Sequence, residues 1–118
     1  ALKSIALTTD SSILTSVAND YGFEDIFSRQ LNALGSSGDI LVGITTSGNS
    51  ENILRAVDAA EKLGAKVVGV TGKDGGKLAE QCELCFIAPS DDTPRIQEAH
   101  LFFGHSLCEL IEQAFAVE

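Results

Sequence analysis

Two short apolar runs with one amphipathic segment between them restrict the fold of this chain more than any other feature. The runs are DILVGI at residues 39–44 and KVVGVT at residues 66–71. Apolar runs of this length are typical of strands that are buried on both faces of a parallel sheet. Between them, residues 50–63 carry apolar side chains at helical spacing and stop at Gly64, which favours a helix. The order strand–helix–strand predicts a parallel α/β unit.

The rest of the chain continues this alternation. We expect further strands at residues 4–8 and 83–88 and helices at residues 11–18, 23–34, 75–80 and 95–115. The pattern predicts a single α/β domain over residues 1–118, a three-layer αβα sandwich in which helices cover both faces of a parallel sheet. Ligands bind such sheets beyond the carboxyl ends of the strands.

The composition restricts the partners and the compartment. With 44% hydrophobic and 21% charged residues among 118, the chain has the composition of a globular domain. A formal net charge of −9 repels nucleic-acid backbones, so we expect no nucleic-acid partner. No apolar run approaches the roughly 20 residues of a membrane span, so we expect no membrane insertion. Three cysteines, an odd and low count, favour a reducing, cytoplasmic location over a disulfide framework.

A run rich in hydroxyl side chains, TTSGNSEN at residues 45–52, follows the first apolar run, and its hydroxyls belong to Thr45, Thr46, Ser47 and Ser50. Backbone amides at the start of the following helix point outward, and the helix dipole favours an anion there. Gly48 would let the backbone approach such a ligand closely. The alternative is an ordinary loop in which Asn49 or Ser50 caps its own helix. Because one cap residue would suffice for that, the four hydroxyls and the glycine favour a phosphate-binding loop.

Two other motifs give only weak evidence for a functional site. Residues 72–77, GKDGGK, are similar to a P-loop. However, three residues instead of four separate the first glycine from the Gly-Lys pair, and Leu78 stands in place of Ser or Thr. We interpret this segment as a tight turn. Cys82 and Cys85 form a C-x-x-C in a predicted strand, where residues three apart point to opposite faces. They are therefore expected to be core or near-core residues, as is Cys108, and not metal ligands or a redox pair.

Both histidines lie in the last predicted helix, at residues 95–115. A helical wheel places an apolar stripe on one side of this helix, formed by Ile96, Phe103, Leu107, Leu110, Ile111 and Ala114. His100 falls at the margin of the stripe and is expected to pack against the core. His105 falls opposite the stripe, facing solvent, a partner chain or a site. The pattern alone does not distinguish an exposed histidine from a functional one.

Four stretches taken together resemble the phosphoheptose isomerases of the sugar isomerase (SIS) domain family, in order and over the whole chain. They are NDYGFEDIFSRQ from residue 19, TTSGNSEN from residue 45, VTGKDGGK from residue 70, and RIQEAH with the later GH from residue 95. The resemblance implies a flavodoxin-like, doubly wound fold and a ketose–aldose isomerase that acts through an enediol. The implied reaction converts sedoheptulose 7-phosphate into D-glycero-D-manno-heptose 7-phosphate for heptose and lipopolysaccharide core synthesis. The resemblance further implies a cytosolic homotetramer that binds zinc.

The resemblance also implies roles for individual residues. Thr45, Thr46, Ser47 and Ser50 would hold the sugar phosphate, and Asn19 and Asp20 would contact the substrate. Gln97 would bind both substrate and metal. His105 would be a metal ligand and the catalytic acid/base. These residue types suit the chemistry, because an imidazole titrates near neutrality and zinc accepts imidazole nitrogen and amide oxygen.

Two expectations concern the completeness of the site. By the resemblance, family members begin with a helix, a strand and a glycine-rich loop, followed by a helix carrying a His and a Glu of the site, and none of these is found here. We therefore expect that a natural N-terminal portion, including the first strand, is missing from this sequence and that the chain alone is inactive. Gln97 and His105 are separated by eight helical residues, about 12 Å along the axis, so we expect the complete site at a subunit interface.

Two other functions stay open. A non-catalytic regulator of the same family binds the bacterial replication initiator protein, and by the resemblance it keeps the RIQE run but lacks a histidine at the position of His105. A sugar-phosphate sensing module would keep the hydroxyl-rich run without needing His105. The presence of His105 and of an intact TTSGNS favours the isomerase over both.

Overall fold

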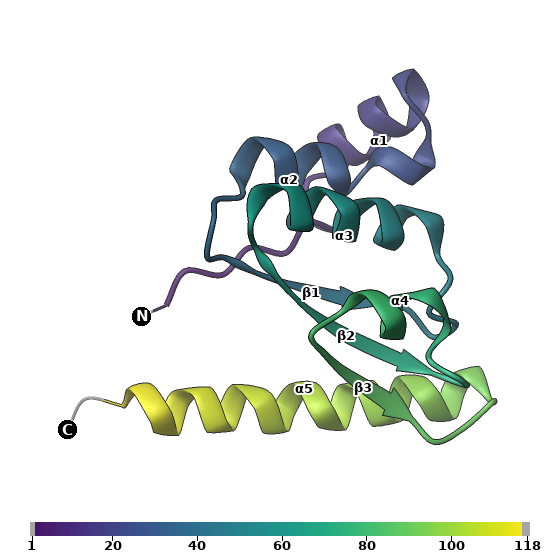
Figure 1. Cartoon of the computed structure of the whole chain (residues 1–118), viewed down its shortest axis with the longest axis vertical. Coiled ribbons are helices and arrows are strands. Elements are labelled where there is room, and N and C mark those ends of the chain that lie inside the picture. Colours follow the sequence, from purple (N-terminus) through teal and green to yellow (C-terminus); the bar gives the residue numbers. More distant parts are fainter. Residues whose placement is uncertain (1, 117–118) are drawn as a thin grey trace.

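A three-stranded parallel sheet in the order β1-β2-β3 organises the computed structural model, which describes residues 2–116 (Figure 1). The strands are β1 (Ile40–Ile44), β2 (Lys66–Gly72) and β3 (Leu84–Ala88). The helices are α1 (Ser11–Asp20), the 3₁₀ turn η1 (Phe23–Asp25), α2 (Ser28–Leu34), α3 (Glu51–Leu63), α4 (Gly76–Gln81) and α5 (Thr93–Phe115). The predicted α/β class, with helices between parallel strands, is confirmed.

Local sequence specifies the end of α3. The helix follows Ser50, and Gly64 ends it in the left-handed conformation at φ 74°, which glycine adopts without the steric cost of a side chain. Leu54, Val57 and Ala60 lie on one side of the helix and are buried in the main hydrophobic cluster. This is the helix that the periodicity of the sequence predicted.

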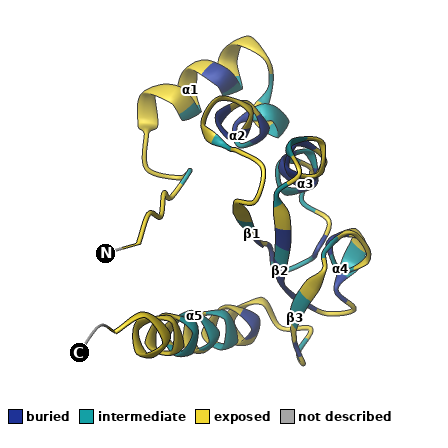
Figure 2. Cartoon of the chain, turned by 60° about the vertical axis from the view of Figure 1, so that its left-hand side comes forward, coloured by how far each residue is buried: buried dark blue, intermediate teal, exposed yellow. Residues whose placement is uncertain are grey.

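The sheet lies between two helical layers. α3 and α4 cover one face, where a Cβ built on Gly43 would lie 3.2 Å from the Ile53 side chain and 3.6 Å from that of Leu78. α5 covers the other face, where a side chain at Gly72 would collide with the fully buried Ile96. Figure 2 shows α3 and α5 on opposite sides of the strands. The predicted three-layer αβα sandwich is confirmed.

The strand expected at residues 4–8 is wrong. Residues 2–6 have no regular secondary structure, and the side chains of Leu2 and Ile5 are 59% and 69% exposed. One side chain holds the segment, because Gln30 Nε2 donates to the Leu7 carbonyl at 2.9 Å. An apolar run becomes a strand only when a neighbouring strand pairs with its backbone. Within the described residues β1 pairs with β2 alone.

The helix expected at residues 23–34 is interrupted between η1 and α2. Ser28 Oγ donates to the Asp25 carbonyl at 3.2 Å, a local side-chain bond that competes with the helical backbone. The Asp25 carboxylate is bound by Arg55 of α3 at 2.8 Å, so a tertiary contact also fixes the break. The helix expected at residues 11–18 is confirmed as α1.

Strand β1 is not buried on both faces as expected. On the side facing α5, its Ile40, Val42 and Ile44 side chains are 64%, 44% and 58% exposed. α5 packs on β2 and β3. A helix is about 10 Å wide and neighbouring strands are about 4.8 Å apart, so a single helix covers about two strands. The apolar run therefore predicted the strand correctly but not its burial.

Only the first half of the predicted apolar stripe of α5 is covered. Ile96 is fully buried, and Phe103 stacks on Phe86 of β3 with ring centroids 4.7 Å apart. The exposed members of the stripe are Leu110, Ile111 and Ala114. A helix of 23 residues is about 34 Å long, and a five-residue strand is only about 17 Å long, so α5 extends beyond the sheet (Figure 1). Among the residues described, no helix is long and apolar enough to cross a membrane.

The geometry expected for the C-x-x-C pair is wrong because Cys82 is not in a strand. It is the C-cap residue of α4, and Cys85 lies in β3. A Cβ built on Gly69 would lie 2.6 Å from Cys82 Sγ and 3.0 Å from Cys85 Sγ, so both sulfurs lie on the same side of the sheet. Both are free, partly buried thiols, as a near-core position requires, whereas Cys108 is exposed and its expected burial is wrong.

We expect Cys82 to be alkylated much more slowly than Cys108 below pH 9. Burial, together with the neighbouring Cys85 thiol, raises the pKa of Cys82 from 9.0 to about 11, so roughly a hundredfold less of the reactive thiolate is present below pH 9. Stability linked to the neutral thiol is fully present below pH 9 and is lost as the pH rises through 11. Iodoacetamide pulses at several pH values, read by peptide mass spectrometry, give the rates. Equal rates for Cys82 and the exposed Cys108 at pH 8 would contradict the prediction.

Candidate functional site

The segments that follow the three strands meet at one edge of the sheet. Because the strands are parallel, their carboxyl ends all lie at this edge, as the arrowheads in Figure 1 show. Residues 45–50, called the hydroxyl loop below, lead from β1 into α3. Residues 73–75 lead from β2 into α4, and residues 89–92 lead from β3 into α5. This is the edge at which parallel α/β sheets bind ligands.

Side-chain contacts hold the hydroxyl loop in a compact turn. Thr45 Oγ1 lies 2.6 Å from Ser50 Oγ and 3.5 Å from Ser47 Oγ. The Thr45 amide donates to the Val70 carbonyl at 3.0 Å, which anchors the loop to β2. Thr46, the next residue, is partly exposed. The structure thus brings together three of the four hydroxyl groups that the sequence singled out, those of Thr45, Ser47 and Ser50.

The start of α3 has unpaired backbone amides. Ser50 stands at the N-cap position, but its side chain makes no capping hydrogen bond, because it bonds to Thr45 instead. Within residues 2–116, the N–H groups of Ser50, Glu51 and Asn52 donate to no protein acceptor. Unpaired N–H groups at the positive end of a helix dipole attract an anion. The alternative of a simple capping loop does not describe this geometry, because neither Asn49 nor Ser50 caps α3 with its side chain.

The glycine-rich segment, residues 72–77, packs directly against the hydroxyl loop. Gly48 adopts φ 67°, and a Cβ built on it would collide with the Gly75 carbonyl and lie 2.9 Å from Cα of Gly76. The Leu78 amide donates to the Gly48 carbonyl at 3.0 Å. Glycines allow this close backbone approach. Residues 73–75 of this segment form a tight turn between β2 and α4, as predicted, in which the Gly75 amide donates to the Gly72 carbonyl at 2.9 Å.

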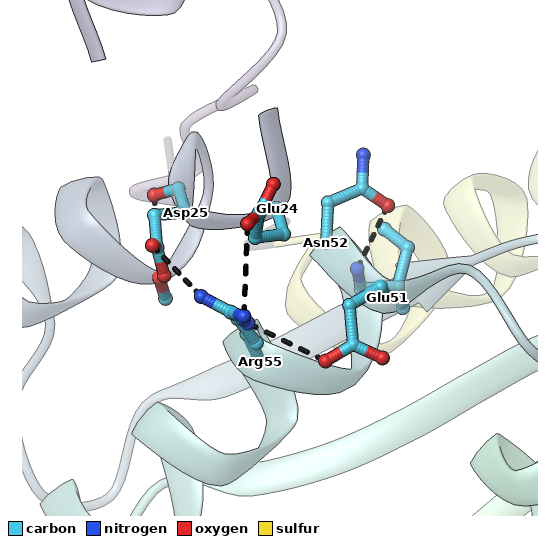
Figure 3. A network of polar contacts seen from close by, with 7 residues as sticks. Glu24, Asp25, Glu51, Asn52 and Arg55 are labelled. Atoms are coloured by element: carbon cyan, nitrogen blue, oxygen red, sulfur yellow. Dashed lines mark hydrogen bonds and ion pairs between the residues drawn. The ribbon is translucent and has the colours of Figure 1, made fainter. Parts of the chain in front are cut away.

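Arg55 joins α3 to η1 (Figure 3). Its guanidinium lies 2.8 Å from Asp25 Oδ2, 3.7 Å from Glu24 Oε1 and 3.4 Å from Glu51 Oε1. The hydrogen bond with Asp25 raises the pKa of Arg55, because the carboxylate favours the charged form. The network ties η1 to the first turns of α3, next to the hydroxyl loop. Sequence reasoning missed Arg55, although its i, i+4 spacing from Glu51 was an available signal.

Asn19 and Asp20 lie at the C-terminal end of α1, both exposed, and Asn19 Nδ2 donates to Asp20 Oδ1 at 2.8 Å. η1 follows closely in the chain, so the Arg55 network anchors this part of the chain to α3. Within residues 2–116, no hydrogen bond joins the Asn19 or Asp20 side chain to the hydroxyl loop. Their predicted contact with a substrate stays a prediction.

The two histidines of α5 have different environments, as the helical wheel predicted. His100 Nε2 lies 2.8 Å from the carbonyl oxygen of the buried Thr71, and its ring meets that of Phe86 edge-on, so His100 is a packing residue. Gln97 and His105 are exposed. α5 runs back from the carboxyl edge of the sheet (Figure 1), so His105 lies about 7.5 Å beyond His100, toward the amino ends of the strands. One chain by itself does not bring His105 to the hydroxyl loop, which leads into a helix on the opposite face.

Residues 2–116 of one chain offer no complete set of donors for the zinc ion that the resemblance implies. Gln97 and His105 lie about 12 Å apart along the axis of α5, whereas zinc ligands lie about 2.0–2.3 Å from the ion. Residues 2–116 contain no cluster of three or more His, Cys, Asp or Glu side chains that could hold a metal ion. The described residues of one chain therefore do not fit zinc by themselves.

The fold and this edge define the class: an α/β protein with clustered hydroxyl groups and unpaired backbone amides at the start of a helix. The model of the SIS domain matches residues 1–72. The chain therefore belongs to the SIS domain family, as the four sequence stretches predicted.

Two curated relatives and one solved structure of this family are named phosphoheptose isomerase. The chain is 53% identical over 111 residues to the phosphoheptose isomerase of Aliarcobacter butzleri, with 94% of this chain and 59% of that protein covered. It is 54% identical over 113 residues to that of Aneurinibacillus thermoaerophilus, with 96% and 57% covered. The solved phosphoheptose isomerase of Neisseria gonorrhoeae matches with a TM-score of 0.90 and 47% identity over 92% of this chain and 61% of that one. The chain thus spans 57% to 61% of the length of these relatives.

Proposed function

We propose that this chain belongs to an enzyme that converts sedoheptulose 7-phosphate into D-glycero-D-manno-heptose 7-phosphate, a step of heptose synthesis for the lipopolysaccharide core. The observation that carries the proposal is the hydroxyl loop, where the Thr45, Ser47 and Ser50 hydroxyls gather beside unpaired amides at the start of α3. A phosphate ester is an anion of the size and charge that such a loop binds. The identity to proteins named phosphoheptose isomerase supports a seven-carbon sugar as the group that carries the phosphate.

In this proposal the bound phosphate positions the sugar. Hydroxyl groups of the loop, including that of Thr46, donate to its oxygens, and the α3 amides add further donors. The phosphate ester is remote from the two carbons that react, so its binding energy orients the sugar and does not activate it. Asn19, Asp20 and Gln97 are proposed to contact the rest of the sugar.

His105 is proposed to transfer the proton between adjacent carbons through an enediol. Ketose–aldose isomerisation needs a group that both accepts and returns a proton near neutral pH, and an imidazole meets this requirement. Because His105 lies away from the hydroxyl loop of its own chain, we propose that the site is completed at a subunit interface. The assembly is proposed to be a cytoplasmic homotetramer that binds zinc, with Gln97 and His105 from different subunits supplying two of the donors.

An isomerase assay on the protein in its full natural length tests this proposal. We expect turnover of sedoheptulose 7-phosphate, which NMR of the sugar would measure. Turnover of unphosphorylated sedoheptulose should be much lower, because this sugar lacks the phosphate that the hydroxyl loop binds. A chelator is expected to remove the activity and zinc to restore it. Folded, zinc-loaded, full-length protein that does not isomerise the phosphorylated sugar would rule the function out.

A further inference from the structure

We propose that Asn49 is a positioning residue that holds the hydroxyl loop in its phosphate-binding shape. The inference rests on the proposed phosphate binding of this loop. Asn49 Nδ2 donates to the Ser47 carbonyl at 2.9 Å, and the Asn49 amide donates to Ser47 Oγ at 3.2 Å. Asn49 Oδ1 accepts the Lys77 amide at 3.2 Å, across 28 residues of sequence. One exposed side chain thus connects the loop to the first turn of α4.

These contacts supply acceptors for two further amides in the first turn of α4. Gly75, the N-cap residue of α4, has no side chain, and the neighbouring Asp74 Oδ1 accepts from the Gly76 amide at 3.1 Å. The first amides of a helix need acceptors from outside it. Asn49 Oδ1 accepts from Lys77, and the Gly48 carbonyl accepts from Leu78 at 3.0 Å. The hydroxyl loop therefore caps α4, and α4 in return fixes the loop.

The same contacts fix the phosphate donors. Ser47 is held at its carbonyl by the Asn49 side chain and at its hydroxyl by the Asn49 amide. A Cβ on Gly76 would lie 2.6 Å from the Ser47 carbonyl oxygen and 2.7 Å from Asn49 Nδ2, so the loop fits closely over the glycine-rich segment. Preorganised donors bind an anion without first losing conformational freedom. Loss of the Asn49 side-chain carboxamide should weaken phosphate binding and leave the chemical step intact.

Asn49→Ala in the full-length protein tests the inference. We expect the dissociation constant of inorganic phosphate and the KM for the sugar phosphate each to rise about tenfold, with kcat within about twofold of wild type. Hydrogen exchange at the Lys77 amide should become faster, because its acceptor is gone. Ala79→Gly is the matched control: it weakens α4 through helix propensity without removing a contact of Asn49, so it should lower Tm and leave phosphate affinity unchanged.

The outcomes separate this inference from the isomerase proposal, because the phosphate titration needs no turnover. Phosphate affinity that depends on Asn49 in a protein without isomerase activity would support the positioning role and reject the function. An active enzyme in which Asn49→Ala leaves phosphate affinity unchanged would support the isomerase function and reject the positioning role of Asn49. The inference is also overturned if Ala79→Gly weakens phosphate binding equally, if kcat falls at constant KM, or if the wild type binds no phosphate. Should Asn49→Ala not fold, Asn49→Ser, too short to bridge Ser47 and Lys77, gives the same test.

Discussion

His105→Ala is expected to lower kcat of the full-length protein by about 10²- to 10⁴-fold, the usual contribution of a general acid/base. His105 is exposed on α5. Within residues 2–116, its side chain makes no hydrogen bond, so its removal should cost little folding stability. The loss should appear in kcat, measured with saturating sedoheptulose 7-phosphate, while phosphate affinity stays unchanged.

His100 provides the matched control on the same helix. His100→Ala removes the contact with the Thr71 carbonyl and the edge-on contact with Phe86, so it should lower Tm and leave kcat of the folded protein nearly unchanged. If the two substitutions lower kcat equally, the loss reflects damage to α5 and His105 has no role in proton transfer. A catalytic role for His105 is also excluded if His105→Ala retains full kcat.

Gly48→Ala is expected to destabilise the protein strongly and to distort the hydroxyl loop. Two costs add at this position. Gly48 has φ 67°, and a side chain in the left-handed region costs roughly 1–2 kcal/mol. The new Cβ would also collide with the Gly75 carbonyl, and its neighbours there are backbone atoms that cannot rotate away. Overpacking of this kind costs about 1–3 kcal/mol more.

Gly38→Ala separates the two costs. Gly38 also has a positive φ, 89°, but a Cβ built on it would have nothing within 4 Å. We expect Gly48→Ala to lower the free energy of unfolding by about 1–3 kcal/mol more than Gly38→Ala, since only Gly48 adds the collision. Urea unfolding of both variants measures the difference. Equal destabilisation would mean that the two loops relax with equal ease and that the fit between residues 45–50 and residues 72–77 is not tight.

Local patterns were enough to predict the features that depend on neighbours in sequence. The periodicity of residues 50–63 and the position of Gly64 predicted α3 almost to the residue, because helical spacing and a left-handed terminator act over a few residues. The helical wheel separated His100 from His105, since both lie on one regular helix. The hydroxyls of the 45–50 loop could be identified as one group because a single turn holds them.

Features that depend on segments distant in the sequence could not be predicted from local patterns. An apolar run at residues 4–8 carries the propensity of a strand but cannot supply its own pairing partner. The break between η1 and α2 involves Arg55, which is 30 residues from Asp25. Asn49 was visible only as a possible cap of its own helix, whereas it caps α4, 28 residues further along the chain.

By itself, the sequence therefore determined the order of strands and helices from residue 39 onward, the position of the hydroxyl loop and the orientation of the two histidines. The tertiary structure alone decided which apolar faces are covered, which side chain caps α4, and that His105 lies away from the hydroxyl loop of its own chain. The physical reason is the distance along the sequence over which each kind of interaction acts. Backbone conformation and helical periodicity are fixed by residues a few positions apart, whereas burial, capping between elements and the assembly of a site depend on segments that meet only when the chain folds.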